Sequence, residues 1–176
     1  MLAEWKALTE LRSATLRGAD DAYFAREMPT PTGPGTMGDF LHIRVLDCWI
    51  HEQDMRRALD KPGHSGGPAA AHTIDRLLRT IPIVVGKRAA TPEGGAVVID
   101  ITGEVSRHVV CEVTGGRAAI VESATDEPIA TVVLDSDTFL VLATGRRAAS
   151  ALAGRIGLSG DQALGQRVVD NLNMMI

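Results

Sequence analysis

Two long stretches with the apolar period of a helix fill the first third of the chain, and short strand-like runs fill the rest. Between them lies the segment KPGHSGGP, residues 61–68, whose prolines and glycines are typical of a linker. The sequence therefore predicts a helical domain at residues 1–60, a linker at 61–68 and a second domain at 69–176. A chain of 176 residues has room for two such domains.

Two main helices make up the first part. Residues 2–17 predict a helix because large apolar side chains recur every three residues, at Leu2, Trp5, Leu8 and Leu11. Residues 29–35 are rich in proline and glycine and predict an irregular loop. Thr36 then predicts the N-cap of a second helix that runs from residue 37 to about 59. Two helices form only part of a bundle.

The second part predicts an α+β domain. Runs rich in β-branched residues predict four short strands, at residues 96–101, 108–113, 118–122 and 129–134. Helices are expected at 69–85, bent or ended by Pro82, and within 135–153 and 160–173. Strands followed by helices favour one mostly antiparallel sheet, covered on one face by the helices at 135–153 and 160–173.

Charge and composition exclude several classes of protein. The net charge of −4 argues against nucleic acid as a partner, which requires a basic surface. No apolar run approaches the length of a membrane helix, and charges within the first twelve residues argue against a signal peptide. The two cysteines, Cys48 and Cys111, are expected to be reduced thiols. We therefore expect a cytoplasmic protein that acts on a small molecule and binds no membrane.

The second helix has titratable groups on its apolar side. With 100° per residue, Asp47, His51 and Asp54 fall within about 40° of Phe40, in the middle of the apolar stripe. Burial there is unfavourable unless such groups are paired or bind something. We expect the side chains of Asp47 and His51 to approach one another and to be largely buried in any complete assembly.

Asp47 and His51 are separated by one helical turn, which is the spacing at which one helix offers two ligands to one metal ion. A carboxylate and an imidazole are donors that zinc accepts. The alternative is an Asp–His ion pair that satisfies a buried histidine. Asp54 is either a neighbour that orients these ligands or a surface acid paired with Arg57.

The helix also resembles a known sequence. RVLDCWIHEQDMRRAL, residues 44–59, followed by KPG, resembles the last bundle helix of the mycothiol-dependent maleylpyruvate isomerase family. The second half resembles the C-terminal domain of the same family in three segments: VVLDSDTF at 132–139, ATGR at 143–146 and GRIGLSGDQAL at 154–164. The resemblance implies a DinB-like, metal-binding helical bundle followed by a domain similar to sterol carrier proteins.

The resemblance also implies a site. In that family an acid and a histidine of this helix hold a divalent metal, and they correspond to Asp47 and His51 here. The expected metal is zinc, which accepts a carboxylate and an imidazole. The metal lowers the pKa of mycothiol and holds its thiolate, which adds to the double bond of the substrate. A third ligand, a histidine, is expected from a helix that would precede Met1. Residues 1–41 contain no histidine, so two helices and one ligand are expected to be missing.

A cationic side chain is expected to stabilise the enolate-like charge that forms during such an isomerisation. Arg146 and Arg155 are the candidates for this catalytic role. For each of them the alternative is an ordinary surface arginine near the end of a helix.

Three functions follow from these observations. The first is a metal- and mycothiol-dependent isomerase or S-transferase, the second a non-catalytic remnant that acts as a binding module, and the third a small-molecule or lipid-binding protein. The apolar faces of the two long helices also predict a homodimer, in which each chain donates both helices to a four-helix bundle.

Overall fold

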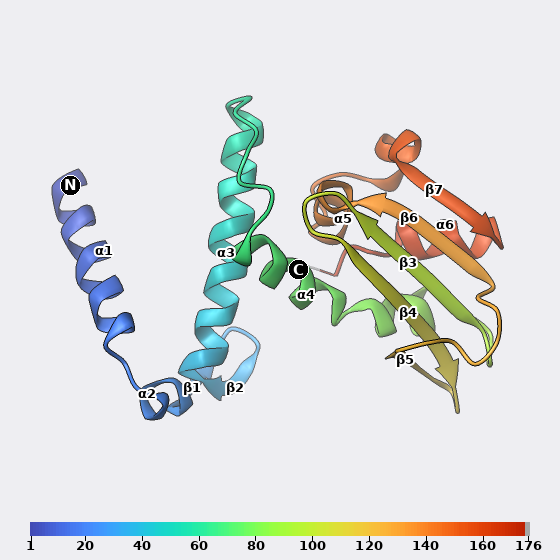
Figure 1. Ribbon diagram of the computed structural model, residues 1–176, viewed down its shortest axis with the longest axis horizontal. Coiled ribbons are helices and arrows are strands. Elements are labelled where there is room, and N and C mark those ends of the chain that lie inside the picture. The colour runs from blue at the N-terminus through green and yellow to red at the C-terminus, as the bar shows by residue number, and fades with distance from the viewer. Residues whose placement is uncertain (175–176) are drawn as a thin grey trace. The chain divides into compact units, whose positions relative to one another are not determined.

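The computed structural model describes residues 1–174 (Figure 1). Its residues form two compact units, Met1–Cys48 and Trp49–Ile176, and the division falls within one continuous helix, α3 (Met37–Ala58). The linker predicted at residues 61–68 stays a prediction. None of the helices within residues 1–174 is both long and apolar enough to cross a bilayer.

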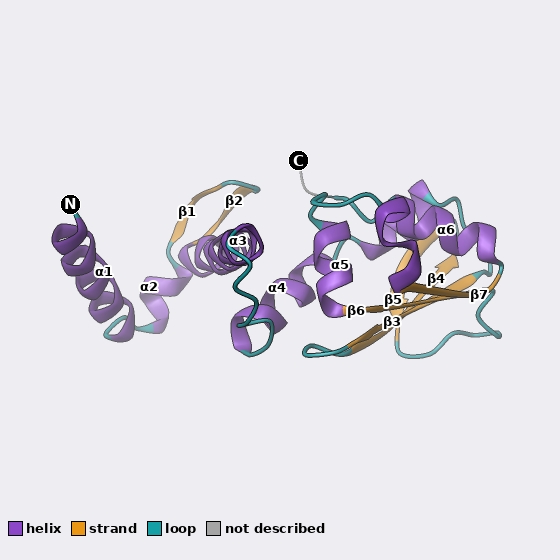
Figure 2. Ribbon diagram, turned by 90° about the horizontal axis from the view of Figure 1, so that it is seen from above, coloured by secondary structure: helices purple, strands orange, loops and turns teal. Residues whose placement is uncertain are grey.

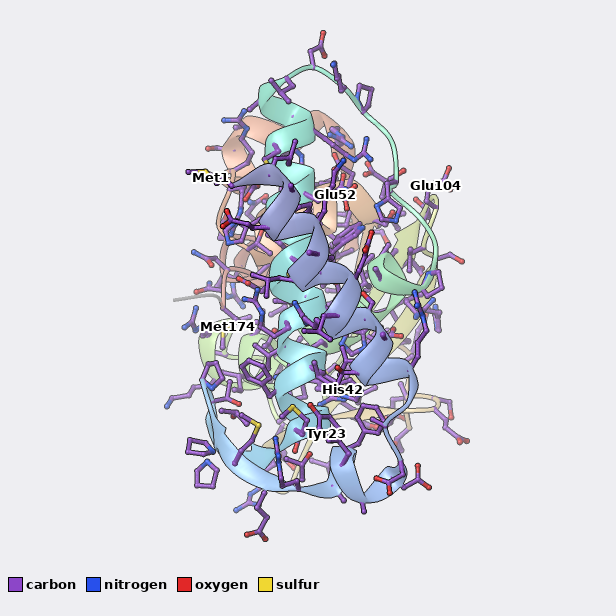
Figure 3. The ribbon with its side chains drawn as sticks, turned by 90° about the vertical axis from the view of Figure 1, so that its left-hand side faces the viewer. Met1, Tyr23, His42, Glu52, Glu104 and Met174 are labelled. Carbon is purple, nitrogen blue, oxygen red and sulfur yellow. The ribbon has the colours of Figure 1, made fainter. Side chains whose placement is uncertain are left out.

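The first unit begins with the predicted helix, α1 (Leu2–Arg17), which is confirmed. A short helix, α2 (Asp21–Ala25), follows and is capped by Asp20, whose side chain accepts a hydrogen bond from the amide of Tyr23. Figure 3 shows α1 with α3 behind it, and Tyr23 and His42 near the end at which the two helices are connected.

The loop predicted at residues 29–35 is wrong, because this segment forms a two-stranded hairpin of β1 (Glu27–Thr30) and β2 (Gly33–Thr36). Prolines usually disfavour strands because they have no N–H to donate. Here Pro29 faces Pro34 across the ladder. Facing residue pairs in an antiparallel ladder alternate between hydrogen-bonded and non-hydrogen-bonded pairs. One non-hydrogen-bonded pair can therefore accommodate both prolines.

Helix α3 starts as predicted. Thr36 and Asp39 form a reciprocal cap, in which the amide of Asp39 donates to Thr36 Oγ1 at 3.1 Å and the amide of Thr36 donates to Asp39 Oδ2 at 2.9 Å. The helix ends at Ala58, before Pro62 and Gly63, close to the predicted end.

The second unit contains α4 (Pro68–Leu78) and a π-helix, η1 (Ile83–Arg88). The predicted helix at 69–85 is thus interrupted, and Pro82 lies directly before η1. Pro68 occupies the first turn of α4. Backbone N–H groups in this turn have no acceptor within the helix, so proline costs no hydrogen bond there.

A five-stranded sheet forms the centre of this unit. Its strands are β3 (Ala96–Thr102), β4 (Arg107–Thr114), β5 (Arg117–Val121), β6 (Ala130–Asp135) and β7 (Ile156–Gly160). Their order is β5-β4-β3-β6-β7, and only the β3–β6 pairing is parallel (Figure 1). The predicted α+β fold with a mostly antiparallel sheet is confirmed.

The helices α5 (Ser136–Ala143) and α6 (Gln162–Asp170) lie on one face of this sheet (Figure 2). A 3-10 helix, η2 (Ala149–Arg155), directly precedes β7. Fully buried side chains fill the space between these layers, among them Val97, Ile99, Phe139 and Leu164. Alternation along the strands places Glu112 on the opposite face, where it is buried and accepts a hydrogen bond from the amide of Thr125. The connection between β5 and β6 therefore shields part of that face.

Candidate functional site

Asp47 and His51 lie one turn apart on α3, as predicted, because the helix is continuous from Met37 to Ala58. The carboxylate of Asp47 is 39% exposed and forms an ion pair with Arg44 on the preceding turn. The imidazole of His51 is 63% exposed, and its Nδ1 lies 3.5 Å from Oδ2 of Asp54. The burial that we expect for both residues in a complete assembly stays a prediction.

The donor types at Asp47 and His51 suit a divalent metal such as zinc, which binds carboxylate oxygen and imidazole nitrogen. A catalytic zinc site has three protein ligands and one open position. Within residues 1–174, no group of three or more His, Cys, Asp or Glu side chains is arranged to hold a metal ion. Helix α3 therefore supplies two ligands of the right chemistry, and a third would have to come from elsewhere.

Asp54 connects this helix to the second domain. Its two carboxylate oxygens accept hydrogen bonds from Nε and Nη2 of Arg146, at 3.2 and 2.8 Å. This bidentate pair is about one third exposed, and the guanidinium lowers the pKa of the Asp54 carboxyl. Arg146 also donates to the carbonyl of Thr144 at the end of α5. Asp54 thus orients Arg146 toward α3, one turn from His51.

Further ion pairs extend this contact into a network. Arg57 donates to Asp137 at 2.6 Å, and its other terminal nitrogen lies 3.7 Å from Asp54. Arg155 donates to both oxygens of Asp135, at 2.9 and 3.0 Å, and lies 3.4 Å from Asp137. The ion-pair network consists of three arginines and three aspartates: Arg57, Arg146, Arg155, Asp54, Asp135 and Asp137.

The two arginines predicted to be catalytic are therefore both engaged by aspartates in this structure. Arg146 is bound by Asp54, and Arg155 is bound mainly by Asp135. A substrate anion could recruit either guanidinium only in competition with a carboxylate that already neutralises it. Their predicted role in stabilising charge stays a prediction.

The sequence-based interpretation missed a polar contact on the other side of α3. The indole of Trp49 and the side-chain amide of Gln53 both donate to the carbonyl of His64, at 3.1 and 3.0 Å. Trp49 and Gln53 are buried, although a helical projection places them on the polar side. One feature of the sequence could have indicated this contact: Trp49 and Gln53 are one helical turn apart, on the helix that precedes the glycine-rich segment.

The imidazole of His64 completes this contact. Its Nδ1 lies 2.9 Å from a carboxylate oxygen of Glu52, which also accepts a hydrogen bond from Arg56 at 2.8 Å. The hydrogen bond with His64 is the main cause that lowers the pKa of Glu52, and Arg56 adds to it. The segment after α3 is thereby held along the helix, which orders the path from α3 into α4.

The two thiols have different surroundings. Cys48 is exposed on α3, and its Sγ lies 3.5 Å from Nη2 of Arg44. Cys111 is buried in the sheet, and burial raises its pKa to about 11. Of these two thiols, Cys48 is therefore the one that a reagent in solution can reach.

Residues 69–167, more than half of the chain, match the family of the MDMPI C-terminal domain. The matched segment begins in α4 and ends in α6, so it contains the whole sheet and both arginines discussed above. No curated protein matches the chain.

Several solved structures are similar to part of this chain. A sterol carrier protein 2 like 2 from Aedes aegypti is 17% identical, and the alignment covers 55% of this chain and 93% of that one with a TM-score of 0.41. Sterol carrier protein domain 2 of Helicoverpa armigera is 14% identical, with coverages of 62% and 92% and a TM-score of 0.43. Sterol carrier protein 2 from Yarrowia lipolytica is 13% identical, with coverages of 59% and 92% and a TM-score of 0.38.

Proposed function

The chain belongs to the MDMPI C-terminal domain family, and from this premise we propose that it is a metal-dependent isomerase or S-transferase that uses mycothiol as its thiol cosubstrate. The observation that supports the proposal is the continuous helix α3, which presents Asp47 and His51 one turn apart and is bound by the family domain through Asp54 and Arg146. The substrate is a small molecule in the cytoplasm.

Asp47 and His51 are the residues that would bind the metal, with zinc as the metal that suits a carboxylate and an imidazole. A divalent metal bound there would lower the pKa of a thiol and stabilise its thiolate. Arg44 forms an ion pair with Asp47 in this structure. On metal binding, Arg44 would have to move away from Asp47 or share its carboxylate with the metal. At least one further protein ligand is required for a catalytic site.

The family domain has a positioning role in this proposal. Arg146 binds Asp54 with two hydrogen bonds, and Arg57 on α3 binds Asp137 at the start of α5. Together these contacts fix the rotation of the C-terminal half of α3 about its own axis. The direction in which His51 projects is therefore set by residues of the family domain, and Arg146 helps to position α3.

A second candidate function, a non-catalytic binding module, is favoured by two of the same observations. Residues 1–174 contain no group of three metal ligands, and both candidate arginines are engaged by aspartates. Binding of a lipid inside the domain would additionally require the core around Phe139 to open, because this side chain is fully buried between the sheet and the helices.

Zinc binding to the full chain separates these functions. Calorimetric titration with zinc alone should show binding that Asp47→Ala and His51→Ala each weaken by at least about tenfold, the usual effect of losing a ligand or its close support. The matched control is the Asp–His ion pair of Asp100 with His108, which is also solvent-exposed. Replacement of His108 by Ala should leave the affinity unchanged.

Two results would contradict the proposal. The first is an absence of zinc binding in the wild-type chain at any protein concentration, and the second is binding that His51→Ala and His108→Ala weaken equally. If zinc binds as expected, mycothiol-dependent isomerisation of maleylpyruvate should then be lost in Asp47→Ala. Zinc binding without this activity would favour the binding module.

A further inference from the structure

Helix α1 exposes large apolar side chains within the first unit. Leu2, Trp5, Leu8 and Leu11 are each 63–67% exposed, and none of the sixteen residues of α1 is buried. Isolated exposed apolar side chains are common in monomers, whereas a row of large ones is typical of an interface. Trp5, Leu8 and Leu11 form such a row, within about 120° around the axis of α1, and Leu2 extends it at the start of the helix.

A groove adjoins this row within the first unit. Its volume is about 490 Å³, and its apolar lining comes from α1 and from the first half of α3: Leu8, Leu11, Leu16, Met37, Phe40 and Leu41. The lining residues of α1 are centred on the face that contains Leu8. The groove is therefore an apolar surface on which another helix can pack.

The sequence of α1 is self-complementary about Leu8. In an antiparallel pair of α1 helices related by a twofold axis at Leu8, residues whose numbers add to 16 lie at the same level. Trp5 of one copy then lies level with Leu11 of the other, and Glu4 lies level with Arg12. Apolar side chains meet apolar ones, and each acidic side chain near the seam lies level with a basic one.

Both charged residues are available for this pairing. Arg12 lines the groove. Glu4 lies about 80° from Arg12 around the axis of α1, at 100° per residue, so both project from the same side of the helix. The carboxylate of Glu4 lies 2.7 Å from the terminal ammonium of Met1 and remains 81% exposed, so it can accept a second partner. The charges adjoining the apolar row thus favour another copy of α1 in the antiparallel orientation.

We propose that α1 is the homodimer interface of this protein, with two copies of α1 packed antiparallel about Leu8 and each occupying the groove of the other. The antiparallel orientation matches the up-and-down packing of helix bundles and closes the assembly at two chains. The proposal is independent of metal binding and of the proposed activity.

Sedimentation equilibrium of the full chain tests the interface and its register together. Glu4→Arg should weaken the dimer by about tenfold, because it replaces two attractive pairs with two repulsive ones. Arg12→Glu should have the same effect, and the double variant with exchanged charges should restore most of the affinity. The matched control is Glu10→Arg, which changes the charge equally on the opposite side of α1 and should leave the dimer unchanged.

Disulfide cross-linking gives a second readout that does not depend on affinity. In a Cys48→Ser background, Leu8→Cys should form a covalent dimer on mild oxidation because residue 8 meets itself at the twofold axis, and Glu10→Cys should not. A monomer at every concentration would overturn the proposal. A dimer that responds equally to Glu4→Arg and Glu10→Arg, or that cross-links equally through both cysteines, would also overturn it.

Discussion

Replacement of Arg146 by Gln should destabilise the second unit, because it removes the bidentate partner of Asp54. The other basic side chains near that carboxylate are farther away: Nη1 of Arg57 lies 3.7 Å from it, and Nδ1 of His51 lies 3.5 Å from it. Neither makes a pair of parallel hydrogen bonds with it. We expect the variant to leave a half-buried aspartate with weaker compensation.

The magnitude follows from the exposure of the pair. Fully exposed ion pairs contribute about 0.2–1 kcal/mol, and removal of one partner from a fully buried pair costs about 3–5 kcal/mol. The side chains of Asp54 and Arg146 are 32% and 28% exposed, so solvent screens them partly. We therefore expect Arg146→Gln to lower the free energy of unfolding by about 1–2 kcal/mol at neutral pH.

The effect should depend on pH with a defined sign. Arg146 lowers the pKa of Asp54 in the folded state below its ordinary value of 3.8. A carboxyl whose folded-state pKa is lowered contributes stability above the unfolded-state pKa, and loses that contribution as the pH falls through the folded-state pKa. The difference between wild type and Arg146→Gln should therefore be full above about pH 5 and shrink in acid below pH 3.8.

Urea unfolding monitored by fluorescence measures this difference. Trp49 is buried in the second unit, and a Trp5→Phe background removes the exposed indole. Arg147→Gln, at the exposed neighbouring position, is the matched control and should change stability by less than about 0.5 kcal/mol. A double-mutant cycle with Asp54→Asn isolates the pair. Equal effects of the two arginine variants, or a pH-independent effect of Arg146→Gln, would refute the reasoning.

Three further outcomes are expected. Iodoacetamide at pH 8 should alkylate Cys48 in the native protein and spare Cys111, whose pKa is raised to about 11 by burial, and two adducts by mass spectrometry would contradict this. Gly160→Ala should lower the unfolding free energy by about 2 kcal/mol or more, since φ is +71° and the new Cβ would lie 2.5 Å from the carbonyl oxygen of Ile129; unchanged urea denaturation would contradict it. Thr36→Ala should cost about 1 kcal/mol and speed amide exchange in the first turn of α3, and unaltered exchange would count against the cap.

Much of the fold could be predicted because single helices and strands are determined largely by residues close together in the sequence. The three-residue apolar spacing predicts α1, the Thr36 cap predicts the start of α3, and the β-branched runs predict the four strands β3 to β6. The hairpin at 27–36 could not be predicted in this way. Its formation depends on the register that sets Pro29 opposite Pro34, and register is a property of two segments together.

The candidate site was predictable only in part, for a similar reason. The spacing of Asp47 and His51 is local to one helix, so it could be read from the sequence. The partners of Arg146 and Arg155 are Asp54, 92 residues away, and Asp135, 20 residues away, and no local pattern indicates either pairing. The same holds for the buried contact of Trp49 with the backbone of His64.

The parallel pairing of β3 with β6 has a consequence for how this chain is made. During synthesis β3, β4 and β5 emerge first, and adjacent antiparallel connections let them assemble at once. The inner edge of β3, within the apolar run Ala96–Thr102, then stays unpaired until β6 leaves the ribosome. An exposed strand edge of this kind recruits other chains. During synthesis this edge of β3 is thus open to pairing with another chain until β6 has been added to the sheet.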